Sequence, residues 1–177
     1  WREWLQHPTY DEYWARCNTI GRYADIAVPA FQQCGFFDPY VGAGFRSFNG
    51  ISRQGASERA RTQQRIVVGP WTHEVPEFSR MGDMDFGTAS IVDIREEEKR
   101  FFDWQLRGID RDIATEKPIR LYVTGAVAWR YEDEWPLPAT RYADYYLHSN
   151  GRAGTDPDDG GLSADPPTDE QTDSYSY

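Results

Sequence analysis

The stretch Arg65-Ile-Val-Val-Gly-Pro-Trp-Thr-His73 predicts a short buried strand that ends abruptly and then presents a histidine. Its three consecutive β-branched residues, Ile66 to Val68, favour an extended segment that is buried on both faces. Pro70 ends the strand, because proline has no N–H for the sheet and restricts the backbone of the residue before it. We therefore expect His73 on a loop just past the carboxyl end of a strand, where open α/β sheets bind their ligands.

An aspartate follows the same pattern one strand earlier. Residues Ala24 to Cys34 hold the expected strand, Gly35 ends it, and Asp38 comes shortly afterwards, directly before Pro39. An aspartate at such a place is either a turn-forming residue or an acid held at the carboxyl edge of the sheet. The sequence leaves both interpretations open.

The segment between the two strands predicts how they pair. Val41 to roughly Ser52 has one apolar stripe and predicts a helix, after which a polar stretch returns the chain to the strand at Ile66. A strand, a helix and a strand at this spacing form a crossover, which makes the two strands parallel. Asp38 and His73 are then expected at the same edge of one sheet.

Asp38 and His73 supply two of the three groups of a nucleophile–base–acid triad. An aspartate that accepts a hydrogen bond from Nδ1 of a histidine fixes the tautomer of the ring and leaves Nε2 as a general base. In the α/β-hydrolase order the serine precedes the acid, and the histidine comes last. The chain has no G-x-S-x-G; the nearest approach, Gly50-Ile-Ser52-Arg-Gln-Gly55, has the wrong spacing and follows the acid. We therefore expect the nucleophilic serine upstream of Trp1.

Length and composition limit the class of protein. A chain of 177 residues is long enough for one sizeable core, and an aromatic content of 15% is typical of a folded protein. The net charge of −10 argues against nucleic acids and anionic membrane surfaces as partners. No apolar run reaches the length of a membrane helix. Cys17 and Cys34 match neither a disulfide framework nor metal-ligand spacing, so we expect two buried free thiols, no metal and no cofactor.

The residues before the first strand predict a short helix. Thr9 and Glu12 fit a capping box at the start of a helix over roughly Tyr10 to Cys17, and its aromatic residues share one face. His7 precedes the cap. With no acid or second ligand at a chemical spacing, it is interpreted as a surface histidine.

The residues after His73 predict a long loop and then the best helix of the chain. Residues 74–89 form a loop of a length that is usually functional. Asp83 and Asp85 in this loop are interpreted as turn residues, because the ligand pattern of a calcium loop is absent. Ser90 to Arg107 predicts an amphipathic helix that ends at Gly108.

Beyond Gly108 the pattern becomes that of an all-β module. Pro118 to Gly125 alternates as an amphipathic strand, and Ala143 to His148 is a shorter one, with His148 interpreted as a surface residue. Residues 149–177 carry seven acids and one arginine. Such a segment is disordered if it stands alone, or it is a long loop between strands of a larger β-domain.

A set of short motifs stands in order along the chain to about Leu147. They are Leu5-Gln-His-Pro-Thr-Tyr-Asp-Glu-Tyr-Trp14, Val28-Pro29, Gly35-Phe-Phe-Asp38, Val68-Gly-Pro-Trp-Thr-His73, Asp85-Phe-Gly87, Phe101-Phe-Asp-Trp-Gln-Leu-Arg-Gly108, Val123-Thr-Gly125, Trp129-Arg130 and Trp135-Pro-Leu-Pro138. As an ordered set they resemble the cocaine esterase/glutaryl acylase (CocE/NonD) family of serine hydrolases, relatives of the X-Pro dipeptidyl-peptidases (peptidase family S15) and of α-amino-acid ester hydrolases. Each motif taken singly is weak.

The resemblance implies a domain order of α/β class. Residues 1–18 would close a helical cap, and residues 19–113 would be the C-terminal part of an α/β-hydrolase domain. Residues 114–177 would begin a jelly-roll-like β-domain with an acidic loop or tail.

The resemblance also implies that Asp38 is the acid and His73 the base of the triad. Tyr40, two residues after the acid, either lines an acyl pocket or packs at the start of the following helix. Two positions depart from the family pattern: Phe36 stands where a tryptophan is frequent, and Pro39 stands where a small flexible residue is usual. Neither departure removes a catalytic atom.

The function implied by the resemblance is hydrolysis of an ester or amide by acyl transfer to water. The substrate would be a small-molecule ester or amide, or a short peptide. The chain alone is expected to be inactive, since its nucleophile would lie upstream. We expect a cytoplasmic protein, and the sequence indicates no oligomeric state. The alternative is a non-enzymatic binding module in which Asp38 and His73 are structural.

Overall fold

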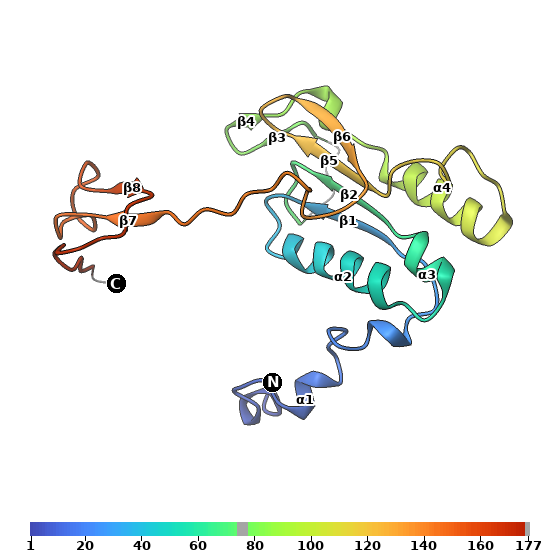
Figure 1. The fold of residues 1–177 in the computed structure, drawn as a ribbon, viewed down its shortest axis with the longest axis horizontal. Coiled ribbons are helices and arrows are strands. Elements are labelled where there is room, and N and C mark those ends of the chain that lie inside the picture. Colours follow the sequence, from blue (N-terminus) through green and yellow to red (C-terminus); the bar gives the residue numbers. More distant parts are fainter. Residues whose placement is uncertain (74–77, 176–177) are drawn as a thin grey trace. The chain divides into compact units, whose positions relative to one another are not determined.

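The protein is described by a computed structural model that covers residues 1–73 and 78–175. The chain divides into two compact units, Trp1–Pro138 and Ala139–Tyr177 (Figure 1). Among the described residues, the first unit contains a four-stranded and a two-stranded sheet, and the second unit contains one two-stranded sheet. Within the described ranges, no helix combines the length and the hydrophobicity that a membrane span requires.

A four-stranded sheet in the order β1-β2-β5-β6 forms the centre of the first unit. The first three of these strands are parallel, and the fourth runs antiparallel to β5. Gly35 pairs with Gly69 in the register of β1 and β2, so both strands end at the same level. The parallel pair predicted from the sequence is therefore confirmed. The strands are β1 (Phe31–Gly35), β2 (Arg65–Gly69), β5 (Ile119–Val123) and β6 (Ala128–Glu132).

Apolar side chains pack on both faces of this sheet. On one face, Phe45 and Phe48 of α2 pack against Ile66 and Val68 of β2. On the other face, Val67 packs with the first residue of α4. β2 is buried along its whole length, as expected for a strand that is covered on both sides. The two long helices are α2 (Val41–Gln54) and α4 (Ile94–Arg107).

The remaining elements of the first unit are short. They are η1 (Trp4–Gln6), α1 (Glu12–Ala15), η2 (Tyr23–Asp25), α3 (Glu58–Thr62), β3 (Arg80–Met81), β4 (Met84–Asp85) and η3 (Thr88–Ser90). The segment that the sequence treats as one long loop therefore contains a two-stranded hairpin and a helical turn, while its residues 74–77 lie outside the described residues.

Three predicted boundaries are wrong. The first helix spans only four residues, and its N-cap is Asp11 instead of Thr9, because the Asp11 carboxylate accepts from the backbone N–H of Tyr13 at 2.9 Å. The first strand begins only at Phe31, since the chain before it is taken up by the helical turn η2. The last helix begins at Ile94, where Asp93 caps it by accepting from the N–H of Glu96.

The cysteines also differ from expectation. Both thiols are free, but Cys17 is exposed and Cys34 is only half-buried. Cys17 lies just past the short helix α1, none of whose residues is buried. The expectation of two buried thiols is therefore wrong.

β5 and β6 extend the sheet of the first unit beyond residue 113. β5 pairs with β2, and its Ile119 and Leu121 complete the same core as Phe45 and Val68. The first unit accordingly continues to Pro138. The domain boundary expected between residues 113 and 114 stays a prediction.

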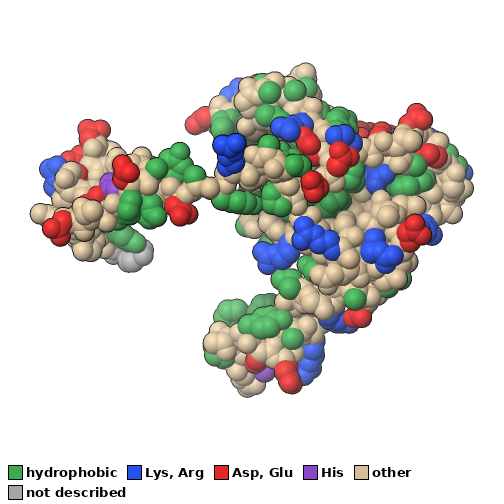
Figure 2. All heavy atoms as spheres, viewed as in Figure 1, with side chains coloured by type: hydrophobic (Ala, Val, Ile, Leu, Met, Phe, Trp, Pro, Cys, Tyr) green, Lys and Arg blue, Asp and Glu red, His purple; other side chains and the backbone are tan. Residues whose placement is uncertain are grey.

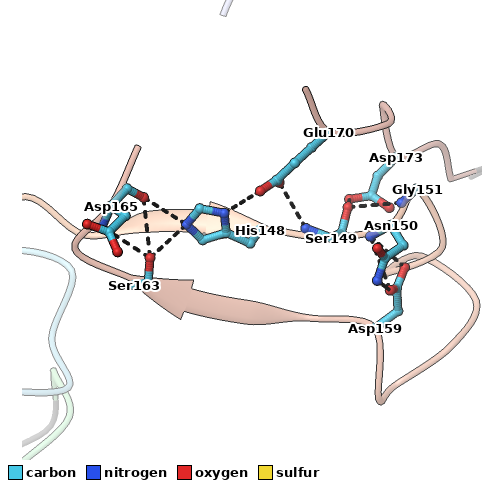
Figure 3. A network of polar contacts seen from close by, with 9 residues as sticks. All are labelled: His148, Ser149, Asn150, Gly151, Asp159, Ser163, Asp165, Glu170 and Asp173. Carbon is cyan, nitrogen blue, oxygen red and sulfur yellow. Dashed lines mark hydrogen bonds and ion pairs between the residues drawn. The ribbon is translucent and has the colours of Figure 1, made fainter. Parts of the chain in front are cut away.

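Polar contacts hold the second unit, whose strands β7 (Tyr146–His148) and β8 (Gly161–Ser163) pair antiparallel. Among its described residues, only Asp159 is buried. The Asp159 carboxylate accepts from the backbone N–H of Asn150 (Figure 3). It also accepts from the backbone N–H of Arg152. Asp173 in turn accepts from Ser149 Oγ. On the face drawn in Figure 2, further acidic side chains are spread over the surface of this unit.

Candidate active site

Asp38 and His73 meet at the carboxyl edge of the central sheet. Asp38 follows the end of β1, His73 follows the end of β2, and Asp38 Oδ2 lies 3.0 Å from His73 Nδ1. The Asp38 side chain is only 8% exposed, whereas that of His73 is 71% exposed. The predicted meeting of the two side chains is confirmed, and their catalytic roles remain a prediction. A solvent-exposed histidine is therefore in contact with a buried carboxylate.

Both oxygens of the Asp38 carboxylate are engaged. Oδ1 accepts from the backbone N–H of Tyr40 at 2.8 Å, and Oδ2 contacts His73. The pKa of Asp38 lies below its ordinary value, because the Tyr40 N–H and then His73 hydrogen-bond to the charged form, against the opposing effect of burial. Since a carboxylate only accepts, the proton belongs on His73 Nδ1. Nε2, which has no partner among the described residues, is then free to accept a proton.

Two backbone hydrogen bonds join the loops that carry this pair. The N–H of Phe36 donates to the carbonyl of Gly69 at 2.9 Å, and the N–H of Phe37 donates to the carbonyl of Trp71 at 2.8 Å. The loops approach so closely that a Cβ at Gly35 would lie 2.1 Å from the Trp71 carbonyl oxygen. Only glycine fits there, so this approach fixes the separation between the acid and the histidine.

Tyr40 contacts Asp38 through its backbone N–H and His73 through its ring. It is the N-cap residue of α2, and its N–H is bonded to Asp38. Its ring meets the His73 imidazole edge-on, with centroids 5.4 Å apart. Phe36 and Phe37, between Gly35 and the acid, are also substantially exposed. The exposed ring of Tyr40, a residue that the sequence indicated, therefore lies beside His73.

The described residues include no serine hydrogen-bonded to His73. Ser52, from the nearest approach to G-x-S-x-G, lies in α2 and lines a cavity of about 210 Å³ together with Gln64 and Pro118. Gln64 directly precedes β2 and Pro118 directly precedes β5, so this cavity lies at the amino edge of the sheet, opposite His73. Across residues 1–73 and 78–175, no three His, Cys, Asp or Glu side chains are grouped as metal ligands.

A second group of serine, histidine and acid lies in the second unit (Figure 3). His148 Nδ1 contacts the Glu170 carboxylate, and Nε2 lies 3.0 Å from both Ser163 Oγ and the carbonyl oxygen of Asp165. The carboxylate and the carbonyl only accept, so these two contacts favour the imidazolium form, in which both ring nitrogens donate. Such a ring has no lone pair with which to activate Ser163. The grouping is therefore a structural ion pair.

Hydrogen bonding to Glu170, the largest contribution, raises the pKa of His148, with a smaller contribution from the Asp165 carbonyl. His148 is partly exposed, at 24%, and its interpretation as a surface residue did not anticipate the contact with Glu170. The sequence gives no local signal for these contacts, since Glu170 lies 22 positions further along the chain.

His7 also has an acid partner that the sequence interpretation missed. Its Nδ1 lies 2.6 Å from Asp11 Oδ2, and its ring stacks on Tyr13 with centroids 4.3 Å apart. The sequence gives no helical signal for this contact, because residues 7–11 lie between the short helices η1 and α1. The chain thus contains a second Asp–His pair, which is well removed in sequence from the first.

Comparison with known proteins identifies the family. The family model described as X-Pro dipeptidyl-peptidase (S15 family) matches residues 1–74, and that described as X-Pro dipeptidyl-peptidase C-terminal non-catalytic domain matches residues 111–177. Cocaine esterase from Rhodococcus sp. (strain MB1 Bresler) is 35% identical over 176 residues, which are 98% of this chain and 29% of that protein. The chain belongs to the CocE/NonD–S15 family of hydrolases. The part matched by the S15 model contains both Asp38 and His73.

Two solved structures share the fold of this CocE/NonD–S15 chain. An aminopeptidase from the marine sediment archaeon Thaumarchaeota archaeon superimposes with a TM-score of 0.68 and 22% identity, over 97% of this chain and 27% of that one. A CocE/NonD family hydrolase from Staphylococcus aureus gives a TM-score of 0.53 and 18% identity, over 86% of this chain and 24% of that one. The chain spans less than a third of the length of each of these relatives.

Proposed function

We propose that this chain supplies the acid and the base of a Ser-His-Asp triad to a serine hydrolase that cleaves an ester or amide. The observation that carries the proposal is the 3.0 Å contact between buried Asp38 and exposed His73 at the carboxyl edge of a parallel sheet. The family supports it, because the relatives include an esterase and an aminopeptidase. The substrate is proposed to be a small-molecule ester or amide, or a short peptide.

In this proposal the nucleophilic serine and the oxyanion hole belong to a segment that precedes Trp1. His73 Nε2 takes the serine proton as the hydroxyl attacks the carbonyl carbon, and the Asp38 carboxylate stabilises the imidazolium that forms. The imidazolium then gives its proton to the leaving alcohol or amine. Water repeats the cycle on the acyl-enzyme, with His73 again as the base, and regenerates the serine.

We assign the parts of the chain in the same terms. Residues 19–113 are proposed as the C-terminal part of an α/β-hydrolase domain, preceded by the end of a helical cap in residues 1–18. Residues 114–177 are proposed to begin a jelly-roll-like β-domain. Tyr40 is proposed to contact the acyl group of the substrate, because its exposed ring meets the edge of His73.

The test uses the intact protein that contains this chain. The His7–Asp11 pair serves as the control. His73→Ala is expected to lower kcat by at least about a thousandfold on p-nitrophenyl esters. Asp38→Asn is expected to lower it by up to about ten-thousandfold, because the amide holds the wrong tautomer of the ring. His7→Ala and Asp11→Asn remove the other Asp–His pair and are expected to leave kcat unchanged.

A small effect of His73→Ala would contradict the proposal. Turnover that survives His73→Ala to within about tenfold would remove His73 as the base, since triad members cost far more than that. Asp38 and His73 would then be structural, as in a non-enzymatic binding module.

A further inference from the structure

Three aromatic side chains form one cluster beside the loop that carries His73. The rings of Trp71 and Trp129 meet edge-on with centroids 6.0 Å apart, and those of Tyr122 and Trp129 meet edge-on at 5.1 Å. Trp71 and Tyr122 are almost fully buried, at 2% and 1% exposure. We call these three residues the aromatic clamp.

The polar tip of each clamp residue donates to a different carbonyl of residues 86–90. Trp71 Nε1 donates to Ser90 at 3.1 Å, and Trp129 Nε1 donates to Ala89 at 2.7 Å. The Tyr122 hydroxyl donates to Phe86. Three donors from three places in the chain therefore fix one short segment, residues 86–90.

The clamp reaches both members of the Asp38–His73 pair through Trp71. Trp71 lies two residues before His73, and its carbonyl accepts from the N–H of Phe37, the residue directly before Asp38. The indole of Trp71 lies against its own chain, because a Cβ at Gly69 would be 2.2 Å from the ring. The orientation of Trp71 is thus set by the clamp on one side and by the strand end on the other.

A second contact connects the clamped segment with the acid. The Phe86 ring packs against the ring of Phe37 with centroids 5.8 Å apart. Phe86 is buried, and its carbonyl is the one that Tyr122 holds. Residues 86–90 therefore contact the chain directly before Asp38 as well as the chain before His73.

Two of the clamp residues come from an unexpected part of the chain. Tyr122 lies on β5 and Trp129 on β6, within the residues matched by the non-catalytic domain model. We propose that Tyr122 and Trp129 are positioning residues for the catalytic pair, acting through Trp71 and residues 86–90. The proposal rests on the proposed function, and it gives part of the region matched by the non-catalytic domain model an indirect effect on catalysis.

The physical basis is the sensitivity of proton transfer to geometry. A general base must keep Nε2 within hydrogen-bond reach of the hydroxyl it deprotonates, and a shift of about 1 Å from a distant change costs about a hundredfold in rate. Removing one clamp donor leaves a carbonyl of residues 86–90 without its partner, and it weakens the support that this segment gives to Trp71 and Phe37. In the described part of the chain, no hydrogen bond or ring contact joins Tyr40 to a clamp residue, so KM is not expected to follow kcat.

The experiment compares three conservative variants of the intact protein. Trp129→Phe and Tyr122→Phe remove a donor and keep an aromatic ring. Trp104→Phe is the matched control, because Trp104 is also half-buried, meets Phe101 edge-on and lies under Arg65, as Trp129 lies under Arg120. No hydrogen bond joins its Nε1 to a carbonyl in the described residues.

We expect Trp129→Phe and Tyr122→Phe each to lower kcat by about tenfold to a hundredfold, with KM changed by less than about twofold. The downfield proton resonance of His73 Nδ1–H is expected to broaden in both variants. Trp104→Phe is expected to leave kcat and this resonance unchanged. If Trp129→Phe does not fold, Tyr122→Phe alone tests the positioning role, since this variant lacks only the hydroxyl oxygen and keeps the ring.

The outcomes separate this proposal from the proposed function. If His73→Ala and Asp38→Asn leave activity intact, the proposed function fails. If those two variants abolish activity while Tyr122→Phe and Trp129→Phe keep the kcat and the His73 resonance of the parent, only the positioning role is overturned. A loss of kcat that Trp104→Phe shares equally also overturns it.

Discussion

The N–H of Phe37 donates to the carbonyl oxygen of Trp71 at 2.8 Å, which joins the residue before Asp38 to the loop that carries His73. This bond joins segments that are separated in the chain by α2, α3 and β2. It stands beside the parallel pair of β1 and β2, which ends at Gly35 and Gly69. The geometry of the proposed acid and base therefore depends on how closely these two loops approach.

Gly35→Ala tests that approach. The added Cβ would lie 2.1 Å from the Trp71 carbonyl oxygen, so the loops must separate. We expect the free energy of unfolding to fall by about 1 to 3 kcal/mol, as for other overpacked sites, and kcat of the intact protein to fall with it. Urea denaturation and ester turnover measure the two effects.

Gly42→Ala is the control for this substitution. A Cβ at Gly42, in α2, meets nothing within 4 Å. Alanine is expected to stabilise the helix there by about 0.5 to 1 kcal/mol. Equal urea midpoints for Gly35→Ala and the parent would show that the loops have more room than the structure allows.

The second unit is expected to lose stability as the pH rises. The pKa of His148 is raised from its ordinary 6.5 by Glu170, so the contribution of the ion pair is complete below pH 6.5 and is lost as the pH rises through the folded-state pKa. The pKa of Glu170 is lowered from its ordinary 4.5, so its contribution is present above pH 4.5 and is lost as the pH falls through the folded-state pKa. Maximum stability is expected between these limits.

Amide exchange of Ser149 reports this change, because its N–H donates to Glu170 at 3.1 Å. Protection, corrected for the intrinsic exchange rate, is expected to fall above pH 6.5 in the parent and to be weak and independent of pH in His148→Gln. Asp165 and Asp173 are the other acids near this pair, and they remain in both proteins. A pH dependence that survives in His148→Gln would point to one of them instead.

Substitution of Tyr40 tests whether its side chain contacts the substrate or only packs at the start of α2. Every variant at this position except proline keeps the backbone N–H that holds Asp38. Tyr40→Ala is expected to raise KM for an aromatic acyl ester such as p-nitrophenyl benzoate by about tenfold, the value of one aromatic contact, with little effect on p-nitrophenyl acetate. Tyr40→Phe is expected to resemble the parent. An equal effect on both esters would assign Tyr40 to packing at the start of α2.

A fluorophosphonate probe tests where the nucleophile lies. The isolated chain is expected to remain unlabelled, since the described residues include no serine bonded to His73. The intact protein is expected to take up one equivalent, at a rate that falls sharply in His73→Ala. Stoichiometric labelling of a serine within the isolated chain would overturn the proposed origin of the nucleophile.

Local sequence determined the elements whose formation needs no distant partner. The three β-branched residues before Gly69-Pro70 form β2, the apolar stripe after Tyr40 forms α2, and Gly108 ends α4 with a left-handed backbone at φ 67°. The crossover between β1 and β2 follows from these elements and the handedness of such connections. The meeting of Asp38 with His73 could be predicted for that reason.

Contacts between residues that are far apart in the sequence could be known only from the tertiary structure. The alternating pattern of Pro118 to Gly125 predicted a strand but not its partner. β5 pairs with β2, and its Ile119 and Leu121 complete the core that β2 shares with α2. The aromatic clamp and the His148–Glu170 pair likewise depend on which carbonyls and carboxylates lie within about 3 Å, a distance fixed by packing. Spacing along the chain was enough to predict the proposed acid and base, Asp38 and His73. The contacts of the aromatic clamp beside them could be identified only from the tertiary structure.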